Sequence, residues 1–145
     1  MMRQLSASAL VLALGACNNP TDLGKQRIIG AIDPSSTTVP VIVAPAEVEA
    51  QAPFSVVVHT YATLGCSSPD GQDLSEQGDL VRIVPYDIVA APGHTDVCTS
   101  EGIIHEHRFN VELSNKGEAR LRVVGSSLAS RGDRLDSVEV AVSVR

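Results

Sequence analysis

The stretch that decides the fold is Ile104-His-Glu-His-Arg-Phe-Asn-Val-Glu-Leu113. Phe109, Val111 and Leu113 share one face of an extended chain, because successive side chains point to opposite sides. The other face carries Glu106, Arg108, Asn110 and Glu112. This period-two pattern predicts a β-strand with one buried and one exposed face.

The residues that follow predict more strands. Ser114-Asn115-Lys116-Gly117 has the composition of a hairpin connection, with a glycine where φ is expected to be positive. Ala119, Leu121 and Val123 would form the inner face of the return strand. A closing strand is predicted from the alternation of Val138, Val140, Val142 and Val144 with more polar residues.

The preceding residues continue the pattern. Phe54 to Tyr61 alternates, and Asp79 to Tyr86 predicts a strand that ends at Pro85. Val39 to Val43 contains a proline and suits an edge strand. No segment after Cys17 shows a sustained helical period, so residues 39–145 predict an all-β domain. The expected architecture is an antiparallel, immunoglobulin-like β-sandwich of about seven strands.

The sequence between two of these strands is rich in turn residues and acids. Ser68-Pro69-Asp70-Gly71 predicts a turn, since proline presets φ and glycine accepts a positive φ. Acidic residues recur every three positions beyond it, but Gln72 and Leu74 occupy positions where a calcium loop needs oxygen ligands. We therefore expect a solvated loop that contains Asp70, Asp73, Glu76 and Asp79.

The N-terminus carries an export signal. Arg3 precedes an apolar run from Leu5 to Leu14, too short for the roughly 20 residues of a membrane span. Leu14-Gly15-Ala16-Cys17 has the form of a lipobox. Residues 1–16 are thus predicted to be a lipoprotein signal peptide, with Cys17 as the lipidated first residue of the mature chain. The alternatives are an ordinary secretory cut after Gly15 and a cytoplasmic protein with a chance apolar start.

Residues 17–38 are polar and interrupted by prolines and glycines, which predicts a tether between lipid and domain. Within this tether, Arg27 to Ile32 is apolar enough to form a short strand that docks on the domain, and the sequence does not decide between this strand and an irregular tether.

Two cysteines remain after Cys17 is assigned to the anchor. Cys66 and Cys98 both lie in turn-rich sequence, and a pair in an oxidising compartment usually forms a disulfide. The alternative is two free buried thiols.

Charge and composition exclude some partners. The chain has a formal net charge of −6, and loss of Arg3 with the signal peptide makes the mature protein more acidic. An acidic surface argues against nucleic acid or anionic lipid as a partner. Aromatic residues make up only 3% and tryptophan is absent, so the core must be aliphatic.

His105 and His107 are the most suggestive side chains. Residues two apart on a strand point the same way, so two imidazoles could share copper or zinc, with His94 or His59 as a third ligand. However, both histidines share parity with Phe109 and so continue the inward face, and Glu106 points the other way. We expect half-buried structural histidines that meet a backbone carbonyl, and neither a metal site nor a cofactor. The sequence has no Gly-x-Ser-x-Gly elbow, no phosphate loop, no His-Glu-x-x-His pair and no calcium-loop spacing, which predicts a non-enzymatic protein.

The combined pattern resembles a family. Lipobox, polar tether, Phe54-Ser55-Val56-Val57-Val58, Pro85-Tyr86-Asp87, the two later cysteines and the segment Ala119 to Gly125 are similar to the small uncharacterised bacterial lipoproteins with an immunoglobulin-like β-sandwich domain. This chain lacks the core tryptophan and the cysteine spacing of true immunoglobulin domains.

The resemblance supplies no activity to transfer. It implies a lipid-anchored extracytoplasmic binding or structural module, with the membrane as a partner through Cys17 and an envelope protein or glycan as a possible ligand. The alternative is a metal-binding envelope protein that uses His105 and His107. Asn18 after the lipidated cysteine favours the outer membrane, if the host has one.

Overall fold

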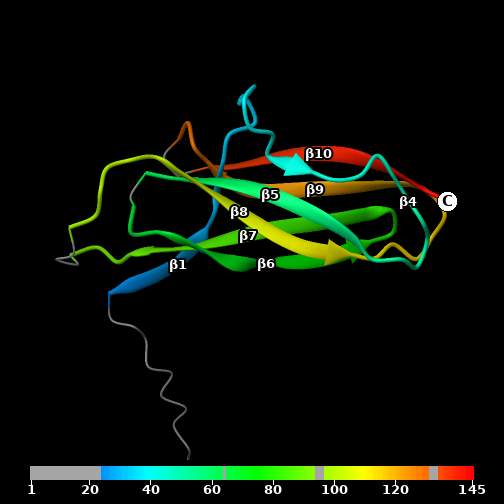
Figure 1. Cartoon of the computed structure of the whole chain (residues 1–145), viewed down its shortest axis with the longest axis horizontal. Helices are drawn as coiled ribbons and strands as arrows, with labels where there is room; N and C mark the ends of the chain where they lie inside the picture. The colour runs from blue at the N-terminus through cyan, green and yellow to red at the C-terminus, as the bar shows by residue number, and fades with distance from the viewer. Residues whose placement is uncertain (1–23, 64, 94–96, 131–133) are drawn as a thin grey trace, which may run out of the picture.

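The computed structural model describes residues 24–63, 65–93, 97–130 and 134–145, and these residues form strands and loops without a helix (Figure 1). No described segment is therefore a helix long and apolar enough to cross a membrane. The prediction of an all-β fold is confirmed. The strands are β1 (Lys25–Ile29), β2 (Ala31–Ile32), β3 (Ile42–Val43), β4 (Glu47–Val48), β5 (Phe54–Ala62), β6 (Ser68–Gln77), β7 (Leu80–Ala90), β8 (Ile103–Val111), β9 (Gly117–Ser127) and β10 (Leu135–Val144).

All ten described strands belong to one sheet that curls into a half-barrel (Figure 1). β5 pairs with β8 on one arm, while β6, β7, β9 and β10 form the other arm. β2 joins the arms, because Ala31 pairs with Tyr61 of β5 and with Ser126 of β9. The sheet is mixed: β2–β9, β7–β9 and β4–β10 are parallel pairs. The expectation of a purely antiparallel arrangement is therefore wrong.

The concave side of the sheet encloses an aliphatic core. Both arms contribute valine, isoleucine and leucine at every second position, as the alternation predicts. Full burial of such a side chain stabilises the fold by about 1.5–3 kcal/mol relative to exposure. The valine, isoleucine and leucine side chains with the least exposure are Ile32, Val56, Val58, Ile83, Leu121, Val123 and Val142.

The predicted hairpin at Ser114-Asn115-Lys116-Gly117 is wrong in its pairing. β8 pairs with β5, whereas β9 pairs with β7, β2 and β10. This segment therefore carries the chain from one arm of the half-barrel to the other. Gly117 does adopt the expected positive φ, at 123°.

The expected acidic loop is instead strand β6. It forms an antiparallel hairpin with β7, and a bulge lies between Pro69 and Gln72, with Gly71 at a φ of 79°. β6 is mostly exposed and, among the described strands, pairs only with β7, so burial imposes no apolar alternation on it. Its polar sequence therefore carries no pattern from which the strand could be predicted.

Pro85 does not end β7, contrary to the sequence prediction. On one side it faces the β6 bulge. On the other side β7 changes neighbours, from β9 at Leu80–Ile83 to β1 at Tyr86–Ala90, so no ladder on that side needs the missing N–H of proline. Its carbonyl accepts a hydrogen bond from the Gly30 amide at 2.9 Å.

β1 and β2 lie within the segment 17–38. The sequence did not decide whether this segment contains a strand docked on the domain. β1 pairs with β7, and Ile32 of β2 is fully buried in the core. Arg27 of β1 stacks over the Tyr86 ring, 3.7 Å from its centroid, and its Nε donates to Asp70 Oδ2 at 2.7 Å.

Cys66 and Cys98 form a disulfide, with 5.2 Å between their Cα atoms. The Gly65 amide also donates to the Thr99 carbonyl at 2.9 Å. Together these bonds tie the segment before β6 to the segment before β8.

Candidate functional site

The inward face of the sheet becomes polar towards one end of the half-barrel. Thr60 continues the inward face of β5 beyond Val58, and His107 and His105 do the same on β8. Asp87 continues the inward face of β7. These four residues are among the few described polar side chains that are almost completely buried.

The carboxylate of Asp87 is the centre of this cluster. His105 Nδ1 lies 2.9 Å from Asp87 Oδ1, and His107 Nε2 lies 3.2 Å from the same oxygen. His107 Nε2 is also 3.0 Å from Thr60 Oγ1, and its Nδ1 is 3.2 Å from the Gly71 carbonyl oxygen. A buried carboxylate needs such donors, because removal from water without them costs several kcal/mol.

The pKa of Asp87 lies below its ordinary value. Burial acts to raise this pKa, but hydrogen bonds from His107, His105 and Thr60 to the ionised form outweigh it. Asp87 is therefore a carboxylate at neutral pH, and a cluster with one buried anion and two imidazoles results.

Ser67 extends the cluster towards the surface. Its Oγ lies 3.2 Å from His105 Nε2, the ring nitrogen opposite the one that faces Asp87. Ser67 follows Cys66 directly, so the disulfide fixes the chain beside it. The result is a hydroxyl, an imidazole and a carboxylate in series.

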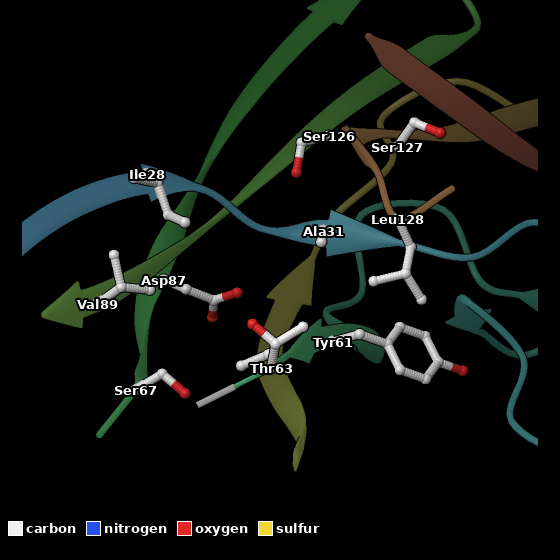
Figure 2. A pocket seen from close by; sticks show the side chains of 11 residues that line it. Ile28, Ala31, Tyr61, Thr63, Ser67, Asp87, Val89, Ser126, Ser127 and Leu128 are labelled. Carbon is white, nitrogen blue, oxygen red and sulfur yellow. The ribbon is translucent and has the colours of Figure 1, made fainter. Parts of the chain in front are cut away.

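A pocket of about 520 Å³ opens next to Asp87 and Ser67 (Figure 2). In Figure 2 the Asp87, Ser67 and Thr63 side chains point into it from different segments. Pockets of this size that combine apolar walls with a few polar groups are typical of small-molecule sites. The lining residues are Ile28, Ala31, Tyr61, Ala62, Thr63, Ser67, Asp87, Val89, Ser126, Ser127 and Leu128.

The structure shows the positions of three of the four histidines considered in the sequence analysis. His105 and His107 point inward as expected, and His107 meets a backbone carbonyl. The sequence offered only Glu106, on the other face, as a carboxylate near the histidines, whereas the structure brings Asp87 of β7 to their own face. His59 lies on the opposite face of β5, where its Nδ1 is 2.7 Å from the Pro40 carbonyl oxygen, so it does not join them.

Asp87 was missed because the β7 prediction stopped at Pro85. The inward parity of Val81 and Ile83, extended past the proline, would have placed a carboxylate inside the sheet. Ser67 gave no comparable signal, since its position depends on the disulfide and on the start of β6.

Metal binding gains no support from the geometry. In the part of the chain that the structure describes, no three histidine, cysteine or acidic side chains are arranged to hold a metal ion. Each ring nitrogen of His105 and His107 instead faces a hydrogen-bonding group. Cys17 and His94 lie outside the described residues.

The comparisons with known proteins leave the site to be interpreted from its own geometry. No family model, no curated protein and no solved structure matches this chain.

Proposed function

We propose that this protein is a lipid-anchored ligand-binding module of the bacterial cell envelope, held by lipid on Cys17 in the outer membrane where the host has one. The observation that carries the binding function is the 520 Å³ pocket with the buried Asp87 carboxylate at its wall. The lipobox Leu14-Gly15-Ala16-Cys17 supports the anchor, and the Cys66–Cys98 disulfide suits an oxidising compartment.

The finer fold assignment, an immunoglobulin-like sandwich, belongs to this proposal. Support comes from seven strands of five or more residues and from two arms that face each other across one aliphatic core. The mixed pairing and the continuous sheet are departures from the antiparallel form.

The pocket walls define the chemistry of the ligand. Ile28, Val89 and Leu128 offer apolar contact, whereas Asp87, Thr63 and the serines are confined to part of the lining. A compact, largely apolar molecule with one polar end group fits this distribution. Its apolar part would contribute about 25 cal/mol per Å² of buried surface, and its polar end would fix its orientation.

A thermal-shift screen of the full-length protein in detergent tests this proposal. Small apolar amines, alcohols and esters should include compounds that raise the melting temperature, since a ligand at 100 times its Kd stabilises by about 2.7 kcal/mol. Ala62→Trp fills the pocket and should abolish the shift. Ala46→Trp, on an exposed loop, is the matched control and should retain it. A shift that survives Ala62→Trp would place the ligand elsewhere.

A further inference from the structure

We propose that Ser67 acts as the nucleophile, His105 as the general base and the Asp87 carboxylate as the group that orients His105. Ser67 would accept the acyl group of a small ester bound in the pocket. The inference rests on the binding pocket proposed above and adds a covalent reaction to it. It replaces the sequence-based expectation of a protein without enzymatic activity.

The two hydrogen bonds of His105 define the base. With Asp87 ionised, His105 Nδ1–H donates to Asp87 Oδ1 at 2.9 Å, and the Nε2 lone pair is then directed at Ser67 Oγ, 3.2 Å away. Serine hydrolases have this arrangement, in which the imidazole donates a hydrogen bond from Nδ1–H to a carboxylate and accepts one at Nε2 from a hydroxyl. The 3.2 Å distance lies at the long end of hydrogen-bond reach, as is common before substrate binds.

Burial separates Ser67 from the other two groups. The side chains of His105 and Asp87 are 5% and 3% exposed, so water does not compete for their hydrogen bond. Ser67 is only partly buried and lines the pocket, so a bound molecule would lie beside it. The Cys66–Cys98 bond and the Gly65–Thr99 backbone hydrogen bond fix the chain on which Ser67 lies.

His107 and Thr60 are positioning residues in this scheme. His107 Nε2 lies 3.2 Å from Asp87 Oδ1, while its Nδ1 lies 3.2 Å from the Gly71 carbonyl oxygen, so the second imidazole links the carboxylate to the β6 bulge. Thr60 Oγ1 lies 3.0 Å from His107 Nε2. Neither residue lines the pocket, so they act only through Asp87.

The reaction balances with water as the co-reactant. Ser67 Oγ attacks the ester carbonyl carbon and its proton passes to His105 Nε2, while the ionised Asp87 stabilises the imidazolium. The C–O bond to the alcohol then breaks and the alcohol leaves with that proton. Water attacks the acyl-Ser67 ester, again through His105, and releases the carboxylic acid. The Thr63 hydroxyl, which points into the same pocket, can donate to the carbonyl oxygen (Figure 2).

A fluorophosphonate probe applied to the full-length protein in detergent tests the nucleophile directly. We expect one phosphonyl adduct, on Ser67, located by mass spectrometry of peptides. The wild-type protein alone decides this point, so the test survives a variant that fails to fold. No adduct, or an adduct only on another serine, would overturn the proposal.

Turnover of p-nitrophenyl butyrate supplies the second readout. Ser67→Ala and His105→Gln should each lower hydrolysis at least roughly 100-fold, since acid–base assistance contributes about 10²–10⁴. Ser75→Ala removes an exposed hydroxyl on β6 that does not line the pocket, and it should leave the rate within about twofold. Equal rates in wild type and Ser67→Ala would contradict the proposal.

A non-hydrolysable ketone analogue of the butyrate ester separates this inference from the binding function. If the ketone raises the melting temperature but Ser67 is not labelled, the pocket binds ligands and the acyl transfer is wrong. If neither the ketone nor the screened compounds bind and Ser67 is not labelled, both proposals fail.

Discussion

At the scale of single residues, the dominant feature is a charge buried where an aliphatic side chain would fit. Asp87 occupies an inward position on a strand whose other inward residues include Val81 and Ile83. His105, His107 and Thr60 offset the cost of that charge by hydrogen bonds. The fold therefore depends on the ionised state of one carboxyl group.

This dependence predicts acid sensitivity. The pKa of Asp87 is lowered in the folded protein, so its stabilising contribution is present above the unfolded value of about 3.9. It is lost as pH falls through the folded pKa, which lies lower still. The free energy of unfolding, measured with urea at several pH values, should fall steeply below about pH 4.

The matched variants for this prediction are Asp87→Asn and Glu112→Gln. Asp87→Asn leaves two histidines without their anion and should destabilise the protein at neutral pH by about 3–5 kcal/mol, with a flatter acid profile. Glu112 is exposed, so Glu112→Gln should change stability by less than about 0.5 kcal/mol. An Asp87→Asn protein as stable as wild type would show that the carboxylate does not support the fold.

At the scale of elements, the two-residue strand β2 is packed closely between its neighbours. It passes between β5 and β9, and a Cβ on Gly125 of β9 would lie 2.6 Å from Ile32 Cγ2 and 2.8 Å from the Gly30 carbonyl oxygen. The glycine thus permits the close approach that joins the two arms of the half-barrel.

Gly125→Ala should therefore displace β2 and destabilise the protein by about 1–3 kcal/mol, the usual cost of overpacking. Gly102→Ala is the control, because its Cβ would meet no atom closer than 3.9 Å and its φ is not positive. Urea unfolding of both variants checks the difference. Equal free energies of unfolding for the two variants would mean that β2 can shift to accommodate the extra methyl group without loss of stability.

At the scale of the whole molecule, the disulfide restricts the unfolded chain as well as the folded one. It spans 32 positions, and closure of such a loop is worth about 3–4 kcal/mol in the loop-entropy model. Total stabilities are about 5–15 kcal/mol. The double variant Cys66→Ser/Cys98→Ser should accordingly show a clearly lower melting temperature by calorimetry. Two titratable thiols in the unreduced, denatured wild type would disprove the bond itself.

The proposed lipid anchor would also act on the whole molecule. Several acyl chains on Cys17 would hold the protein firmly, since each buried methylene adds about 0.8 kcal/mol and two chains give stable attachment. Mass spectrometry of the mature N-terminus should find a lipidated Cys17, and Cys17→Ser should release the protein from membranes. An unmodified Cys17, or a chain that starts at Ala16, would refute lipidation.

The sequence by itself determined the strands that have one buried face. β5, β8, β9 and β10 follow from alternation, and His105 and His107 were placed inward by parity alone. These features could be predicted because the direction of a side chain in a strand is a local property of the backbone.

Only the tertiary structure decided which strands are neighbours, and the site depends on that choice. The alternation of β8 and β9 is the same whether they form a hairpin or lie on opposite arms, so the Ser114–Gly117 connection could not be assigned correctly. Asp87 meets His105 only because β7 and β8 face one another across the half-barrel. Such contacts join residues far apart in the chain, and no local pattern encodes their distance.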